Sequence, residues 1–125
     1  MALTTTEVAE FARQARELMN DGGDHWTQGD YVTLDLGGVR RFCMIGAVRH
    51  SLFGEADGDQ VNESDPRFIA ITYALKDAIR ELFPNRAGTP AKDATSVVID
   101  FNDDDDTTWE DVEVVLRHAE KALAA

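Results

Sequence analysis

The chain has 125 residues, of which 43% are hydrophobic, and a formal net charge of −12 at pH 7. This length and apolar content predict a single folded domain over residues 1–125 and exclude a wholly disordered chain. The acid excess argues against direct binding to nucleic acid or to anionic membranes, because both need clustered Lys and Arg.

The first amphipathic segment predicts a helix that begins at a capping box, Thr4-x-x-Glu7. Apolar side chains recur at helical spacing from Val8 to Met19. A pair of glycines follows, and glycine readily adopts the left-handed conformation that ends helices. The pattern therefore places one helix in the first twenty residues.

Residues 31–42 predict a small β-hairpin. Residues 31–36 alternate between apolar and polar side chains as a strand does, Gly37-Gly38 is a two-residue turn, and residues 39–42 lead back. An isolated hairpin is only marginally stable in water. We therefore expect this one to lie against helices or to gain a third strand.

Two more amphipathic segments predict helices in the middle of the chain. Residues 43–53 form a short helix that Gly54 ends. The next helix begins at Asp65, a typical N-cap residue, with Pro66 at its first helical position, and runs to about residue 83.

The last third of the chain predicts a strand and a helix. Residues 96–101 are rich in β-branched side chains, which favours a short strand that pairs with the hairpin or crosses the core. A last helix starts near Thr107 or Thr108. The expected fold class is therefore α+β, with about four amphipathic helices packed around a small element made of the β-hairpin and a short strand.

Cysteine content and hydropathy indicate the compartment. Cys43 is the only cysteine, so no internal disulfide forms, in agreement with a reducing compartment. No apolar run reaches the roughly 20 residues that cross a bilayer, and residues 1–20 lack the basic and apolar regions of a secretory signal. We expect a cytoplasmic protein that does not contact membranes.

Two segments carry the whole net charge. Residues 54–65 contain five acids and residues 100–111 contain seven, and neither segment has a Lys or Arg. Concentrated charge of one sign steers a partner of opposite sign. We therefore predict a contact surface for a protein partner with a basic surface. The residues assigned to it are Asp57, Asp59, Glu63, Asp65, Asp103, Asp104, Asp105 and Asp106.

The second acidic segment also allows a metal site. Asp100, Asn102 and Asp104 would fill the first, third and fifth positions of a calcium loop. Asp105 replaces the glycine needed at position six and Asp111 the glutamate at position twelve, which makes a poor EF-hand. No cofactor is expected, and any binding of Ca²⁺ or Mg²⁺ would be weak.

Solvation is an alternative interpretation of both acidic segments. Acids near the start of a helix favour the positive end of its dipole, and Thr107-x-x-Glu110 or Thr108-x-x-Asp111 would form a capping box there. On this interpretation the carboxylates cap a helix and face water, and they bind no ligand.

The residue types also allow a catalytic site with a cysteine nucleophile. Cys43 lies at the start of a predicted helix, where free amides lower a thiol pKa, and His25 with Asn102 or Asp103 would complete the set. The neighbours of Cys43 are apolar, however, which favours a buried and unreactive thiol. We therefore assign no catalytic residue and do not expect an enzyme.

Three short motifs occur in a fixed order along the chain. They are W-x-Q-G at residues 26–29, C-x-x-G-A at residues 43–47, and N-D at residues 102–103 followed by T-x-x-D-V at residues 108–112. This arrangement resembles that of a small family of unknown function from actinobacteria and their phages. The resemblance implies a shared fold and a phage or actinobacterial setting, with the host cytoplasm as the compartment if a phage encodes the chain. It implies no reaction.

We expect the three motifs to meet at one seam made by Trp26, Gln28, Cys43, Asn102 and Asp103. The physical reason is that Asn and Asp side chains at a junction between elements commonly bond the backbone of a neighbouring loop. The seam is either a structural lock or the floor of a concave site, and we favour the lock.

The sequence thus predicts a non-enzymatic acidic accessory protein of phage type that binds a basic host or phage protein. In one version of this hypothesis the protein mimics nucleic acid. The alternative is a divalent-cation-binding protein or small metal-dependent enzyme that uses residues 100–106. A third hypothesis is self-association through apolar helix faces, and the oligomeric state stays open.

Overall fold

Five α-helices, one short 3₁₀ helix and one two-stranded hairpin form the part of the chain that the computed structural model describes, residues 5–20 and 22–125. The elements are α1 (Thr5–Met19), β1 (Val32–Leu34), β2 (Arg40–Phe42), α2 (Met44–Phe53), α3 (Pro66–Leu82), η1 (Pro84–Arg86), α4 (Ala94–Asp103) and α5 (Trp109–Ala124). The predicted α+β class is confirmed, with one more helix than expected. Thr4 of the predicted first capping box lies outside the described residues.

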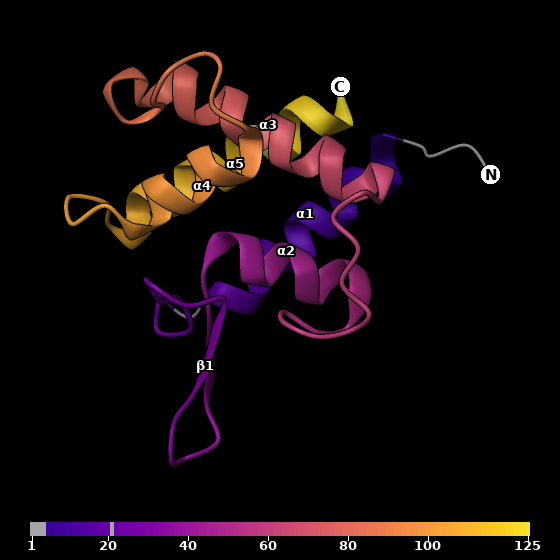
Figure 1. The fold of residues 1–125 in the computed structure, drawn as a ribbon, viewed down its shortest axis with the longest axis vertical. Coiled ribbons are helices and arrows are strands. Elements are labelled where there is room, and N and C mark those ends of the chain that lie inside the picture. Colours follow the sequence, from indigo (N-terminus) through magenta and orange to yellow (C-terminus); the bar gives the residue numbers. More distant parts are fainter. Residues whose placement is uncertain (1–4, 21) are drawn as a thin grey trace.

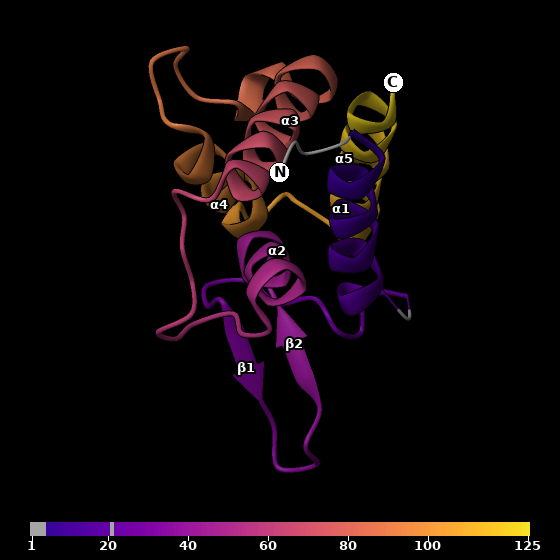
Figure 2. The same cartoon turned by 90° about the vertical axis from the view of Figure 1, so that its right-hand side faces the viewer.

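The helices form one body around a shared core. α1 packs against α5 and α2, and α3 packs against α5 and α4 (Figure 1, Figure 2). Every α-helix contributes at least one large side chain that is fully buried. Examples are Met19, Ile45, Phe68, Leu75, Phe101 and Leu116. In the described residues no helix is long and apolar enough to cross a membrane.

Figure 2 shows the β1–β2 hairpin projecting from this helical body. The strands are antiparallel, with Val32 opposite Phe42 and Leu34 opposite Arg40. A parallel bridge between Trp26 and Phe42 covers the outer edge of β2 at the base of the hairpin. The backbone of the hairpin is therefore bonded to the rest of the molecule at its base, and the Arg41 Nε adds a hydrogen bond of 2.9 Å to the Asp24 carbonyl. An isolated hairpin needs such support, because it is only marginally stable.

The strand predicted over residues 96–101 is wrong, because these residues belong to α4. The Asp93 side chain caps this helix by accepting a hydrogen bond from the Ser96 amide at 3.2 Å. Val97, Val98 and Phe101 are buried, which is the spacing of a helix face and not the alternation of a strand. Packing against α3 and α2 thus outweighs the strand preference of the β-branched side chains.

Local signals explain where α2 begins. Cys43 is its N-cap, and the Cys43 Sγ accepts a hydrogen bond from the Gly46 amide at 3.3 Å. The chain at Tyr31 crosses directly over this first turn, and a Cβ on Gly46 would lie 2.6 Å from the Tyr31 carbonyl carbon and closer still to its oxygen. Only glycine fits at this crossing.

The helix starts predicted around the acidic segments are also present. Asp65 caps α3, accepting a hydrogen bond from the Arg67 amide at 2.8 Å. α5 begins with a reciprocal capping box between Thr108 and Asp111. Of the two capping boxes that the sequence allows, the structure therefore uses the second.

Candidate functional site

Asn102, at the end of α4, is the centre of the seam. Its side chain is buried, and its Oδ1 accepts hydrogen bonds from Trp26 Nε1 at 2.8 Å and from the Met44 amide at 3.0 Å. Its Nδ2 donates to the Thr27 carbonyl at 3.0 Å and to Asp103 Oδ1 at 2.9 Å. An amide side chain offers two donors and two acceptor positions, so its bonding capacity is filled.

The loop after Trp26 is bonded to the same helix end. Gln28 Nε2 donates to the Asn102 carbonyl at 2.8 Å and to the Asp104 carbonyl at 3.0 Å, and the Gly29 amide donates to Asp103 Oδ1 at 2.9 Å. The last carbonyls of a helix have no partner within it, and Gln28 supplies one. The W-x-Q-G loop therefore closes the C-terminal end of α4.

Cys43 lies beside this network without joining it through its thiol. It is only 5% exposed, and burial raises the pKa of the thiol, with Asp103 acting in the same direction. A thiol held in its protonated form is a poor nucleophile. The seam therefore has the geometry of a lock that joins three segments, and no activated nucleophile is found there.

A small pocket opens beside the lock and brings the two acidic segments together. Its volume is about 220 Å³. It is lined by Gly29, Asp30, Tyr31, Val32, Cys43, Asp57, Ile99 and Asp103. We call it the acidic pocket, because its carboxylates come from three separate segments and no Lys or Arg lines it. Within the described ranges, Asp30 and Asp57 make no hydrogen bond or ion pair.

The other acids of the predicted contact surface differ in how far the protein already uses them. Glu63 forms an ion pair with Arg49. Asp65 forms one with Arg67 at 2.7 Å, and this hydrogen-bonded guanidinium lowers the pKa of the Asp65 carboxyl. Both charges are largely neutralised by neighbours in the native fold.

The turn between α4 and α5 contains the remaining acids except Asp59, which lies in the loop between α2 and α3. Asp104 Oδ1 accepts a hydrogen bond from the Asp106 amide at 2.8 Å. The carboxylates of Asp59, Asp105 and Asp106 are exposed and have no partner among the described residues. Together with Asp57, they are the acids of the predicted surface that remain free to meet a partner.

Each of the three candidate metal ligands already has a partner within the protein. Asp100 forms an ion pair with Lys92, the Asn102 oxygen is already doubly bonded, and Asp104 caps the turn. On a strand, residues 100 and 102 would share a face, but on a helix they lie about 200° apart. In the part of the chain that the structure describes, no three His, Cys, Asp or Glu side chains are grouped to hold a metal ion.

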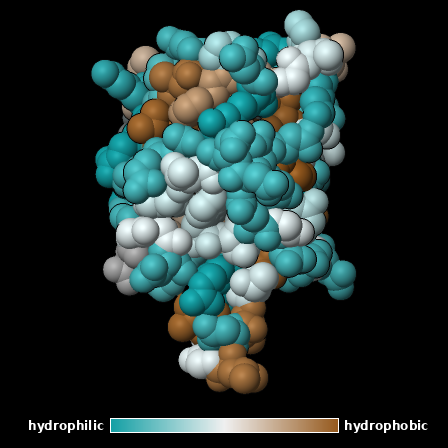
Figure 3. All heavy atoms as spheres, turned by 90° about the vertical axis from the view of Figure 1, so that its left-hand side faces the viewer, coloured by the Kyte–Doolittle hydropathy of each residue, from teal (hydrophilic) through white to brown (hydrophobic). Residues whose placement is uncertain are grey.

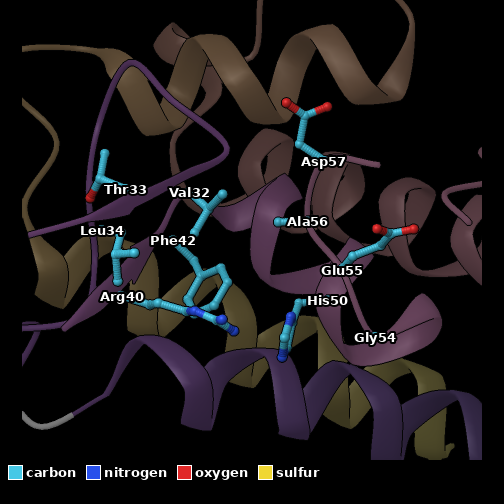
Figure 4. A pocket seen from close by; sticks show the side chains of 10 residues that line it. All are labelled: Val32, Thr33, Leu34, Arg40, Phe42, His50, Gly54, Glu55, Ala56 and Asp57. Carbon is cyan, nitrogen blue, oxygen red and sulfur yellow. The ribbon is translucent and has the colours of Figure 1, made fainter. Parts of the chain in front are cut away.

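A groove of about 340 Å³ lies between the hairpin and the end of α2, and we call it the hairpin groove. The residues that line it are Val32, Thr33, Leu34, Arg40, Phe42, His50, Gly54, Glu55, Ala56 and Asp57 (Figure 4). The rings of Phe42 and His50 pack with centroids 5.1 Å apart. Burial lowers the pKa of His50, and the charge of Arg40 adds to the effect.

Apolar side chains are exposed next to this groove. Leu34 is 66% exposed, and Leu36 in the turn is fully exposed. Figure 3 shows apolar residues gathered at the end of the projecting hairpin, below a largely hydrophilic face. The groove is not evident from the sequence, although the alternation of residues 31–36 places Val32 and Leu34 on one face.

The comparisons with known proteins identify a family but no function. The model of a family described as "Family of unknown function (DUF6197)" matches residues 3–122. No curated protein and no solved structure gives a match.

Proposed function

The chain belongs to DUF6197, a family of unknown function, and we propose that it is a non-enzymatic accessory protein that binds a protein partner with a basic surface. The observation that carries this proposal is the acidic pocket. Asp57 from the first acidic segment and Asp103 from the second line the same cavity, together with Asp30. Segments far apart in the sequence thus present like charges at one place.

Electrostatics favours a cationic partner there. Like charges held close together raise the free energy of the unbound protein, and an approaching Lys or Arg surface relieves that repulsion. Asp30 and Asp57 have no internal partner among the described residues, so their charges are available. Asp105 and Asp106 extend the same charge along the turn after α4.

The setting that we propose follows from the motif resemblance. The W-x-Q-G, C-x-x-G-A and N-D motifs resemble those of an actinobacterial and phage family, so the partner that we propose is a basic host or phage protein in the cytoplasm. One such class is nucleic-acid-binding proteins, for which carboxylates would stand in for phosphates. The filled lock around Asn102 and the protonated thiol of Cys43 agree with a binding role in preference to a catalytic one.

The test is affinity capture from an actinobacterial lysate at low salt with two variants of equal charge. The first variant replaces Asp57, Asp105 and Asp106 by Asn, all of which are free of internal partners in the described chain. The control replaces Asp77 by Asn, and Glu81 and Glu113 by Gln, on α3 and α5, where Asp77 and Glu81 are exposed and Glu113 is half-buried.

We expect the wild type and the control to capture the same basic protein and the first variant to lose it. Exposed ion pairs contribute little to stability, so both variants should fold. Equal capture by the two variants would contradict the proposal, as would the recovery of no basic protein. Binding should also weaken steeply with salt, because exposed charges are screened beyond about 10 Å at 0.1 M.

A further inference from the structure

We propose that the outer edge of β1 binds an extended basic segment of the partner as a third strand. This inference rests on the proposed function and names how the partner is held. It is carried by three features that lie side by side: an unpaired strand edge, the hairpin groove and the acidic pocket.

The backbone bonding of the hairpin shows which groups face outward. The Cys43 amide donates to the Tyr31 carbonyl at 3.3 Å, and the Asp35 amide donates to the Val39 carbonyl at 3.1 Å. In an antiparallel ladder, inward-bonded and outward-facing residues alternate. Since Tyr31 and Asp35 bond inward, the amide and carbonyl groups of Val32 and Leu34 face the outer edge.

The opposite edge of the hairpin is already covered at its base. The Phe42 amide donates to the His25 carbonyl at 2.8 Å, and the Phe42 carbonyl accepts from the Thr27 amide at 3.0 Å. β1 has no such neighbour, because within the described residues it pairs with β2 alone. The edge of β1 is therefore the one that offers a row of unpaired backbone groups, which is the template for strand addition.

The hairpin groove gives such a strand a place for apolar side chains. Val32, Leu34 and Phe42 line the groove from the hairpin, and Ala56 lines it from the loop after α2. In Figure 4, Arg40 and His50 lie toward one end of the groove and Asp57 toward the other. An apolar side chain of the added strand would cover Leu34, which the free protein leaves 66% exposed.

Charge complementarity indicates what kind of segment would pair with the β1 edge. Val32 and Asp57 line both the groove and the acidic pocket, so a strand that follows β1 passes both cavities. Successive side chains on a strand point to opposite faces, so alternation gives a segment one apolar face and one basic face. The expected segment therefore has an apolar residue and a Lys or Arg at alternate positions. A second copy of this chain fits less well, because its own β1 edge would bring Asp30 and Asp57 against the same acids.

The probe is a fluorescently labelled ten-residue peptide of alternating Lys and Val, and binding is measured by anisotropy. Two methylated forms are compared with it. One carries a methyl group on the backbone amide nitrogen of each Lys residue, and the other carries it on the backbone amide nitrogen of each Val residue. All three have the same charge and side chains. In an added strand, the amides of one alternate set face β1 and those of the other set face away.

Strand addition predicts that the two methylated peptides differ in affinity by about tenfold or more, because one loses its hydrogen bonds to Val32 and Leu34 and the other keeps them. Equal affinities would overturn the inference. If the two methylated peptides bound equally but bound the Asp57, Asp105 and Asp106 variant of the protein more weakly than the wild type, the basic-partner proposal would stand. The same peptide with Glu in place of Lys should not bind.

A variant of the protein gives an independent test. Leu34→Pro removes an outward amide, which an edge strand tolerates, and leaves the inward bonds at Tyr31 and Asp35 intact. The matched control Leu34→Ala removes the side chain but keeps the amide. We expect the proline variant to bind the unmethylated peptide about tenfold more weakly than the alanine variant. Equal binding by the two variants would contradict strand addition, and the methylated peptides test it even if the proline variant does not fold.

Discussion

Asn102 and Trp26 are 76 residues apart in the chain, and the indole Nε1 of Trp26 donates a hydrogen bond of 2.8 Å to the buried Oδ1 of Asn102. This bond joins the end of α4 to the loop that leads into the hairpin. The Met44 amide shares the same oxygen, so the start of α2 is held at the same point. One buried amide thus fixes three segments relative to one another.

Replacement of Asn102 by Leu should destabilise the protein strongly. The two side chains have similar size, but leucine leaves the Trp26 indole, the Met44 amide and the Thr27 carbonyl without their partner. Each buried polar group left unpaired costs roughly 1–3 kcal/mol, so we expect a loss of about 3 kcal/mol or more in the free energy of unfolding. Urea denaturation measures it. Gln28→Ala, at the exposed side of the lock, is the control and should cost about 1 kcal/mol.

Gly46→Ala should cost more stability than any other glycine-to-alanine change at an ordinary backbone conformation. Its Cβ would overlap the Tyr31 carbonyl, a rigid backbone group that cannot move aside. We expect a loss of about 2 kcal/mol or more, or a failure to fold. Gly37→Ala is the matched control, since its Cβ would meet only the flexible Asp35 side chain at 3.3 Å. Similar melting temperatures for the two variants would contradict the crossing of Tyr31 over α2.

Added salt should stabilise the protein without regard to the cation. The formal charge of −12 includes exposed carboxylates without partners among the described residues, and screening relieves their repulsion. We expect the melting temperature to rise by on the order of 5 °C between low and about 0.5 M NaCl. About 5 mM CaCl₂, MgCl₂ or MnCl₂ should match NaCl of equal ionic strength. A larger shift from one cation would support the metal-binding alternative.

Acid should weaken the protein in part through Asp65. Its carboxyl accepts hydrogen bonds from the Arg67 side chain and amide, which lower its pKa below the ordinary value of 3.8. A pKa lowered in the folded state gives stability that is present above the unfolded pKa and lost as the pH falls through the folded one. Stability should therefore decline from about pH 4 downward.

The Asp65→Asn variant isolates this contribution. It should unfold at lower urea than the wild type at pH 7, by about 1 kcal/mol for a weakened cap, and the difference should shrink as the pH approaches 2. Parallel pH profiles for the two proteins would show that Asp65 does not carry the effect. Asp59→Asn is the control, because that exposed carboxylate has no partner in the described chain.

Capping and periodicity were enough to predict most of the fold. The Asp65-Pro66 start and the Gly54 end are local signals, and each has its expected element in the structure. The predicted hairpin is also present, but the two-residue turn is wrong, because Asp35 bonds to Val39 and leaves a loop of residues 36–38. α4 was missed because Val97, Val98 and Ile99 favour strands locally, whereas burial against α3 and α2 decides the outcome. The Asp93 cap was the signal that could have identified the helix.

The site was predictable only in outline. Motif order indicated that Trp26, Gln28, Asn102 and Asp103 belong together, but the bonds among them depend on the tertiary fold. The number of charges in a segment does not indicate which of them are paired. Arg49 neutralises Glu63, fourteen residues away, whereas Asp57 has no ion-pair partner among the described residues. The hairpin groove forms only where the hairpin and the chain at the end of α2 lie face to face, and no local sequence pattern predicts that placement.

The lock around Asn102 also divides the hairpin into two dynamic parts. Its base is bonded to the end of α4, which also holds the start of α2, so amides such as that of Phe42 should exchange with solvent deuterium only when the helical body itself opens. Beyond Thr33 and Arg41 the hairpin is held mainly by its own few pairs, and its amides should exchange through local fraying. The projecting end can therefore adjust its shape on a fast timescale while its point of attachment stays fixed.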